Sequence, residues 1–160
     1  MERKEKKFFP LFVDLTQKKA VVIGGGKIAS RRIQTLLPFV REIVVVAPVC
    51  TEKIKALYEN GEIIYKQKKY EITDIENADL VLAVTDNYDL NEEIYKICKE
   101  KNILVNVASN QQKCDFHFPA VIEQDGVVIG INAGGKDHKK VKEVRQNVET
   151  YLTSSREESE

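Results

Sequence analysis

A chain of 160 residues is long enough to bury one hydrophobic core, and its 25 basic and 25 acidic side chains give a formal net charge of zero. That balance excludes a general electrostatic attraction to nucleic acid or to anionic membranes. The three cysteines lack C-x-x-C spacing, which excludes a zinc or disulfide framework and favours a reducing, cytoplasmic compartment. The apolar run after the charged residues 1–7 is short and is broken by Pro10 and Asp14, so it predicts neither a signal peptide nor a membrane span.

Short apolar runs alternate with amphipathic segments through the first two thirds of the chain. We expect an edge strand over 11–15, a central strand over 20–23 and a helix over 28–37. The uninterrupted β-branched run 43–47 is typical of a strand buried on both faces. The remaining expected elements are helices over 51–58 and 90–101 and strands over 62–66, 80–84 and 103–107. This alternation predicts an α/β fold, a Rossmann-like doubly wound parallel sheet of strand order 3-2-1-4-5.

The run Val21–Ala29 carries a glycine turn between the central strand and the first helix. Gly24 permits the tight turn, and Gly26 has no Cβ to keep a pyrophosphate away. Ala29 lets the helix pack closely on the strand, and the helix offers its N–H groups and positive dipole end to phosphates. We interpret the turn as a dinucleotide site; the alternative is a glycine-rich turn that binds nothing.

Ligands of such sheets bind at the carboxyl ends of the strands. Here those ends carry Gly24 to Gly26, Ala47-Pro48, Thr85-Asp86 and Ala108-Ser109. A typical NAD fingerprint has a carboxylate at the end of the second strand, and an arginine there favours NADP. The segment 46–49 contains neither, so this position leaves NAD or NADP open, and backbone groups around Pro48 and Val49 are candidates to hold the ribose.

After Asn110 the pattern changes. Strands over 116–123 and 127–132, joined by Gln124-Asp125-Gly126, predict a β-hairpin, and a helix over 138–152 follows. This part is too small to have its own core, so a second copy of the chain is its expected packing partner. We therefore expect a nucleotide-binding domain over 1–113, a dimerisation segment over 114–152 and a disordered tail over 153–160.

The two histidines have open roles. His117 alternates with Phe116 and Phe118 and is expected on the opposite face of its strand, either as a surface residue or, with Asp115 nearby, as a functional one. His138 stands among lysines that form a solvated face or hold a polyanionic ligand. Cys114, Asp115 and His117 offer only loose metal spacing, so we predict no metal site.

Six segments match one known family in order. They are Phe9–Phe12, Val22–Ala29, Ala83–Asn87 with Leu90-Asn91, Asn106–Ser109, Cys114–Ala120 and Ile129–Gly135. Over about residues 8–152 the chain resembles the precorrin-2 dehydrogenase and sirohydrochlorin ferrochelatase family, of the siroheme synthase N-terminal type. The glycine turn alone does not identify this family; the later segments in this order do.

The resemblance implies NAD-dependent oxidation of precorrin-2, an anionic tetrapyrrole, to sirohydrochlorin in siroheme or cobalamin biosynthesis. Some members then insert iron. It also implies a homodimer whose subunits interlock their hairpin segments. The cofactor-binding residues implied here, with Thr85 at the nicotinamide end, are Gly24, Gly25, Gly26, Lys27, Ile28, Ala29, Pro48, Val49 and Thr85.

One departure from the family concerns catalysis. Members with both activities carry an aspartate in an Asn-Val-x-Asp motif, and this chain has Ser109 there. Without activation a hydroxyl is no general base near pH 7, and it is no hard anionic metal ligand, so we expect hydride transfer without strong chelatase activity. The catalytic candidates are Ser109, Asp115 and His117, and the proton goes to water, Asp115 or His117. The candidates to bind the substrate carboxylates are Lys113, Lys136, His138 and Lys139.

Two other readings of the chain remain. A non-catalytic dinucleotide-sensing module would share the sheet and the glycine turn but would not need segments 114–120 and 129–135. A chelatase or carrier of metal tetrapyrroles would use the nucleotide only structurally.

Overall fold

The computed structural model describes residues 8–157, with side-chain environments for residues 8–154. The chain divides into two compact units. Val13–Phe116 forms one, the sheet unit, and the residues from His117 onward form the other, the hairpin unit, together with the N-terminal segment that ends at Phe12. In the described part of the chain no helix combines the length and the apolar character needed to cross a membrane.

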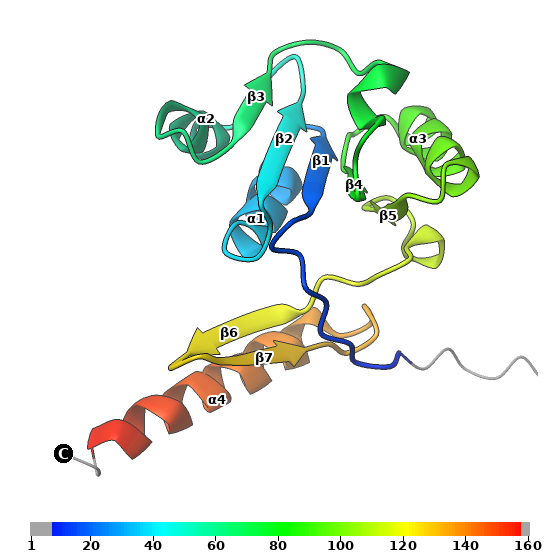
Figure 1. Cartoon of the computed structure of the whole chain (residues 1–160). Coiled ribbons are helices and arrows are strands. Elements are labelled where there is room, and N and C mark those ends of the chain that lie inside the picture. The colour runs from blue at the N-terminus through cyan, green and yellow to red at the C-terminus, as the bar shows by residue number, and fades with distance from the viewer. Residues whose placement is uncertain (1–7, 158–160) are drawn as a thin grey trace, which may run out of the picture. The chain divides into compact units, whose positions relative to one another are not determined.

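The sheet unit is a parallel five-stranded sheet of order β3-β2-β1-β4-β5, which confirms the predicted fold class (Figure 1). Its strands are β1 (Lys19–Ile23), β2 (Glu42–Val46), β3 (Ile64–Lys66), β4 (Leu80–Ala83) and β5 (Leu104–Val107). Its helices are α1 (Lys27–Leu36), α2 (Glu52–Glu59) and α3 (Tyr88–Glu100), with the 3-10 turns η1 (Ile72–Ile75) and η2 (Gln111–Lys113).

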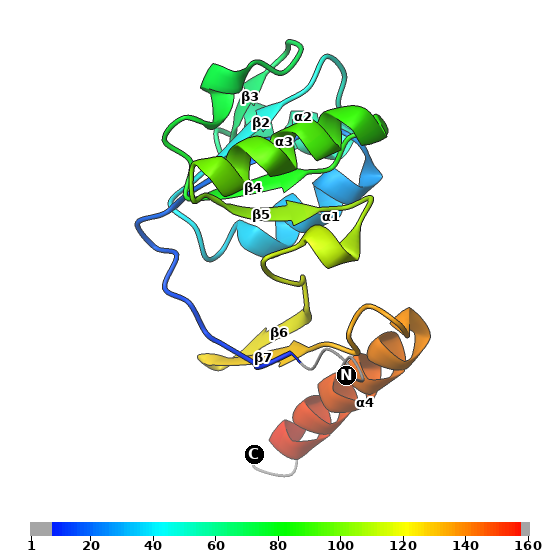
Figure 2. The ribbon, with the colours of Figure 1, turned by 90° about the vertical axis from the view of Figure 1, so that its right-hand side faces the viewer.

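After their first residues, Lys19 of β1 and Glu42 of β2, the central strands are apolar because both faces of the sheet are covered. Val22 of β1 pairs with Val45 of β2 and Leu82 of β4, and all three are fully buried. Figure 2 shows α3 on one face of the sheet and α1 on the other. Ile94 and Cys98 of α3 pack into one cluster with alternate residues of the strands. The sheet therefore holds the carboxyl ends of its strands on a rigid, buried support.

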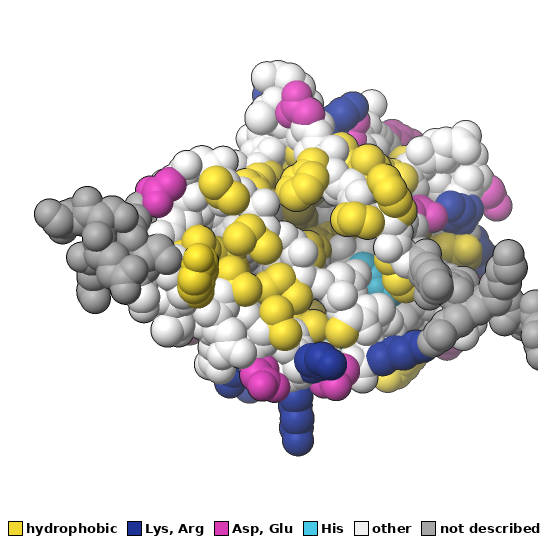
Figure 3. Space-filling model, turned by 90° about the horizontal axis from the view of Figure 1, so that it is seen from below, with side chains coloured by type: hydrophobic (Ala, Val, Ile, Leu, Met, Phe, Trp, Pro, Cys, Tyr) yellow, Lys and Arg dark blue, Asp and Glu magenta, His cyan; other side chains and the backbone are white. Residues whose placement is uncertain are grey.

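The hairpin unit consists of β6 (Ala120–Gln124), β7 (Val127–Ile131) and α4 (His138–Glu157), which packs on the hairpin. Asp125 and Gly126 both have positive φ, 54° and 77°, as the predicted two-residue turn requires. Hydrophobic side chains gather on the face of the molecule that Figure 3 shows. The exposed large apolar side chains of this unit are Phe8, Phe9, Leu11, Phe12, Val127, Val144 and Tyr151.

Three sequence expectations about elements were wrong. Residues 11–15 form no strand, because the Asp14 carboxylate accepts the Thr16 N–H and O–H in a local turn. The strand expected over 116–123 begins only at Ala120. The segment expected to be disordered from 153 is helical to Glu157, as the last turns of α4; the rest of that tail lies outside the described residues.

Candidate cofactor site at the carboxyl ends of the strands

Gly24 and Gly25 are glycines because neighbouring backbones leave no room for a side chain. Gly24 has φ +123°, and a Cβ there would lie 2.5 Å from the carbonyl oxygen of Val84, after β4. A Cβ on Gly25 would lie 2.2 Å from the carbonyl oxygen of Val49, after β2. The Gly24 N–H donates to Val46 at 3.0 Å. The turn is therefore clamped between the ends of the two neighbouring strands.

Gly26 differs from these two glycines. It caps α1 with ordinary φ, and a Cβ on it would meet nothing within 4 Å. Within the described chain no side chain caps this helix end, and no acidic residue stands in its first turn. Gly26, Lys27 and Ile28 are exposed, while Ala29 is fully buried under the helix as predicted. This open helix start fits a pyrophosphate, which would accept its N–H groups and meet its positive dipole end.

The loops after β2 and β3 are joined beside this turn. The Tyr65 hydroxyl donates to the Ala47 carbonyl at 3.0 Å, and the Gln67 amide donates to the Pro48 carbonyl at 3.3 Å. Burial and a hydrogen bond with Cys50 raise the pKa of Tyr65 to about 12. Pro48 and Val49 are exposed, with no carboxylate at this strand end, as the sequence indicates. The end of β2 is thus lined by neutral groups and backbone.

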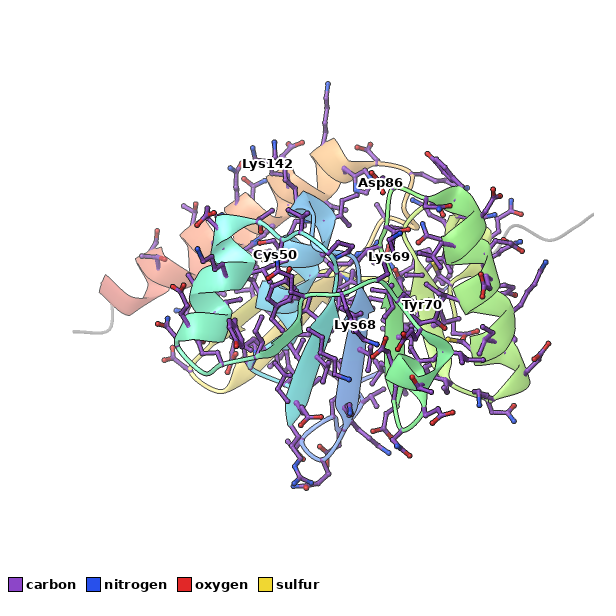
Figure 4. All side chains as sticks on the ribbon, turned by 90° about the horizontal axis from the view of Figure 1, so that it is seen from above. Cys50, Lys68, Lys69, Tyr70, Asp86 and Lys142 are labelled. Atoms are coloured by element: carbon purple, nitrogen blue, oxygen red, sulfur yellow. The ribbon has the colours of Figure 1, made fainter. Side chains whose placement is uncertain are left out.

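Lysines follow β3 on the loop that leads to η1. Figure 4 labels Lys68, Lys69 and Tyr70 on this loop, Cys50 on the loop after β2, and Asp86 after β4. Lys68 forms ion pairs with Glu71 at 2.6 Å and with the buried Asp74 at 3.0 Å. The buried carboxylate of Asp74 therefore anchors this loop through its ion pair with Lys68.

The ends of β4 and β5 are joined by one buried side chain, Asn91 of α3. Its Oδ1 accepts the N–H of Thr85 at 3.2 Å and the Thr85 hydroxyl at 2.7 Å. Its Nδ2 donates to the Thr85 carbonyl at 2.9 Å and to the Ser109 Oγ at 3.3 Å. The structure thus brings together two predicted site residues, Thr85 and Ser109, through Asn91, which belongs to a family segment of the sequence but was not predicted as a site residue. The signal was a polar residue on the α3 stripe that Ile94 and Cys98 continue.

Asp115 lies along the free edge of β5. One carboxylate oxygen accepts the Lys99 ammonium at 2.7 Å, and the other accepts the Val105 N–H at 3.0 Å. The preceding Cys114 accepts the Val107 N–H at 3.3 Å, and burial raises the pKa of its thiol. These contacts tie the segment after η2 to the edge of the sheet.

His117 stands outside any strand, because β6 begins three residues later, so the alternation expected for it does not apply. Its ring lies 4.0 Å from that of Phe8, centroid to centroid, within the hairpin unit. Ser109 and Asp115 belong to the sheet unit. Within residues 8–157, no three His, Cys, Asp or Glu side chains are grouped so as to hold a metal ion.

The candidate substrate-binding residues have different surroundings. Lys113 forms an ion pair with Glu92 and lies 5.3 Å above the ring of Tyr95. Lys136, His138 and Lys139 are exposed in the hairpin unit, where His138 begins α4. The charge of Lys113 is therefore largely compensated inside the sheet unit, while the other three face solvent.

Comparisons with known proteins match most of this chain. The family model described as "Putative NAD(P)-binding" matches residues 11–120. The "Probable multifunctional siroheme biosynthesis protein HemA" of Ruminiclostridium josui is 41% identical over 88% of this chain and 27% of its own length. The siroheme synthase of Mannheimia succiniciproducens is 32% identical over 91% of this chain and 30% of its own length. The chain thus spans less than a third of these curated relatives.

A solved structure described as "SirC, precorrin-2 dehydrogenase" is also similar. It superposes with a TM-score of 0.73 and 26% sequence identity, covering 90% of this chain and 71% of its own. The family match covers more than half of the chain and falls on the sheet and its glycine turn. The chain therefore belongs to the NAD(P)-binding family whose fold is found in siroheme synthases and in this precorrin-2 dehydrogenase.

Proposed function

We propose that this chain oxidises precorrin-2 to sirohydrochlorin with NAD, as a step of siroheme biosynthesis. The observation that supports it best is the open helix start at Gly26, beside two glycines that are closed by backbone. That contrast is expected where a pyrophosphate must approach the helix. The substrate is inferred from similarity, since proteins that match about nine tenths of this chain are named siroheme synthase and precorrin-2 dehydrogenase.

The dinucleotide is held in this proposal by the ends of β1, β2 and β4. Gly24 to Gly26 with Lys27 and Ile28 bind the pyrophosphate, Pro48 and Val49 bind the adenosine ribose, and Thr85 lies toward the nicotinamide. When bound, NAD supplies the acceptor for the hydride that leaves the tetrapyrrole. The protein contributes by holding the reactants in near-attack geometry.

Oxidation of precorrin-2 also releases a proton. Ser109 is a poor base near pH 7, because the side chain that its hydroxyl contacts is the amide of Asn91 and not a carboxylate or an imidazole that could accept its proton. The two oxygens of Asp115 already accept Lys99 and Val105. We therefore propose that the proton goes to water or to His117, and that Asp115 holds the segment between β5 and the hairpin unit in place.

We propose that substrate carboxylates are bound by the exposed side chains of Lys136, His138 and Lys139, with Lys113 contributing less because Glu92 compensates its charge. Such contacts weaken with salt, since the Debye length falls from about 30 Å at 0.01 M to about 3 Å at 1 M. KM for precorrin-2 should rise with salt, and Lys136→Ala with Lys139→Ala should flatten that dependence. An unchanged salt dependence in the double variant would contradict this assignment.

We further propose a cytoplasmic homodimer that buries the exposed apolar side chains of the hairpin unit against a second copy. Support comes from the exposure of Phe9, Val127 and Tyr151, at 85%, 57% and 72%. Sedimentation of the wild type should give the dimer mass, and Val127→Asp should shift it toward the monomer. A wild-type monomer at micromolar concentration would contradict the proposal.

The oxidation itself is tested by its dependence on NAD. Precorrin-2 should be converted by the wild type only with dinucleotide present, and Gly26→Val, which fills the phosphate space, should abolish conversion. Conversion without NAD would contradict the proposal, and insertion of cobalt or iron into sirohydrochlorin without NAD would instead favour a chelatase or a carrier.

A further inference from the structure

The amide of Asn91 has one possible orientation. Asn91 is fully buried, its Oδ1 accepts the Thr85 N–H at 3.2 Å, and its Nδ2 donates to the Thr85 carbonyl at 2.9 Å. A backbone N–H only donates and a carbonyl only accepts, so turning the amide over would lose both bonds. The atom that faces Ser109 is therefore Nδ2, which is a donor.

This orientation determines how the Ser109 hydroxyl is used. Nδ2 lies 3.3 Å from Ser109 Oγ, and Ser109 must accept in this contact because Nδ2 has no lone pair to offer. The single hydroxyl hydrogen of Ser109 is thus not used toward Asn91. Ser109 is exposed at the carboxyl end of β5. Its hydrogen can be donated to a ligand above the strand ends.

Thr85 offers the opposite case on the neighbouring strand. Its hydroxyl lies 2.7 Å from Asn91 Oδ1 and 3.0 Å from the Asn87 carbonyl, both of which only accept. Its oxygen also accepts the Asn87 N–H at 3.2 Å. The one hydrogen of this hydroxyl is therefore used inside the protein. Of the two hydroxyls at the ends of β4 and β5, that of Ser109 is the one arranged to donate outward.

We infer that Ser109, held as an acceptor by Asn91, donates a hydrogen bond to a carbonyl-type oxygen of the bound reactants, with Asn91 as its positioning residue. The inference rests on the proposed function. Two ligand groups have this chemistry: the carboxamide oxygen of the nicotinamide and a carboxylate oxygen of the tetrapyrrole. In either case Ser109 binds and orients, and it removes no proton.

The first experiment compares Ser109→Ala with Ser109→Thr, which keeps the hydroxyl. Affinity for NADH is measured by fluorescence without tetrapyrrole, and KM for precorrin-2 is measured at saturating NAD. Loss of one hydrogen bond predicts a change of about five- to tenfold in Ser109→Ala, with Ser109→Thr closer to the wild type. A change in NADH affinity identifies the carboxamide, and a change in KM alone identifies the carboxylate. If neither quantity changes, the inference is wrong.

A matched control is Ser154→Ala on α4. Ser154 is an exposed serine whose hydroxyl donates to its own helix at the Thr150 carbonyl, at 3.0 Å. Both quantities should stay unchanged in this variant. If the wild type binds NADH but turns over no precorrin-2, only the proposed function is contradicted. The effect of Ser109→Ala on NADH affinity can still be measured in that case.

The second experiment tests Asn91 through Asn91→Asp. A carboxylate has no N–H, so the Ser109 hydrogen would turn inward to bond with it. Asn91→Asp also loses its bond to the Thr85 carbonyl, so it should cause at least the loss seen in Ser109→Ala, and the double variant should lose no more than Asn91→Asp alone. Additive losses would overturn the role of Asn91. If Asn91→Asp does not fold, the comparison of Ser109→Ala with Ser109→Thr decides alone.

Discussion

A Cβ placed on Gly25 would lie 2.2 Å from the carbonyl oxygen of Val49, whereas one placed on Gly26, the next residue, would meet no atom within 4 Å. Two adjacent glycines therefore serve different purposes. Gly25 allows the turn after β1 to touch the loop after β2. Gly26 leaves space in front of α1, where the dinucleotide phosphates are proposed to bind.

This contrast predicts that two neighbouring valines have opposite effects. Gly26→Val should fold with nearly wild-type stability, because its φ of −81° suits any residue, yet it should bind no NADH. Gly25→Val should lose about 1–3 kcal/mol or more of folding free energy, because backbone atoms must move. Urea unfolding and NADH fluorescence measure the two effects. Normal NADH binding by Gly26→Val would show that the pyrophosphate lies elsewhere.

The cysteines predict a second test of the cofactor position. Cys50 is half-buried beside the glycine turn, whereas burial raises the pKa of the Cys98 thiol to about 12. A thiol reagent should therefore modify Cys50 well before Cys98, and NADH should slow the reaction at Cys50. Mass spectrometry of peptides after timed alkylation gives both rates, with Cys98 as the internal control. Equal rates at Cys50 with and without NADH would contradict the placement of the dinucleotide.

Asp74 predicts how stability depends on pH. Burial alone would raise the pKa of Asp74, but hydrogen bonds from Lys68, the Glu71 N–H and Lys66 outweigh it and hold the pKa below the ordinary 3.8. Because the pKa is lower in the folded than in the unfolded chain, this stabilisation is present above about pH 4 and is lost as the pH falls through the folded value.

The variant Asp74→Asn removes this dependence. Its stability at pH 7 should be about 1–3 kcal/mol lower, because two ammonium groups lose their shared partner, and the loss should shrink toward pH 3. Urea midpoints of both proteins between pH 7 and 3 measure it. Parallel curves for wild type and variant would refute the role given to Asp74.

Asp115 can be assigned to support or to catalysis by one pair of variants. Asp115→Asn keeps an oxygen for the Val105 N–H and loses only the ion pair with Lys99, so it should lose under about 1 kcal/mol and keep its kcat within a few-fold. Asp115→Ala loses both contacts and should be less stable than Asp115→Asn. A fall in kcat of about 100-fold or more in Asp115→Asn, at unchanged stability, would make Asp115 the proton acceptor.

The sheet could be predicted because its signals are local. Runs such as Ile43–Ala47 are apolar at every position, as is typical of a strand whose two faces are both covered. The order of strands and helices along the chain then leaves few possible topologies. The strand expected over residues 11–15 was wrong because a largely apolar run suits an edge strand but does not show that the run pairs with a neighbouring strand. The turn at Asp14 and Thr16 ends the extended run instead.

Contacts between distant parts of the chain could not be predicted in this way. Two such contacts depend on where α3 packs against the ends of β4 and β5. One is the ion pair of Lys113 with Glu92, and the other is the set of hydrogen bonds by which Asn91 joins Thr85 to Ser109. The glycine turn was recognised from residue type and spacing. Which of its glycines is closed and which is open became evident only from the neighbouring backbones.

The most direct test of the central claim is anaerobic incubation of the purified protein with precorrin-2 and NAD, without metal, while NADH and sirohydrochlorin are followed spectrally. Both products should appear in equal amounts with the wild type, and neither should appear with Gly26→Val. A wild-type sample that binds NADH but forms neither product would contradict the proposed oxidation of precorrin-2 and favour a non-catalytic dinucleotide-sensing module.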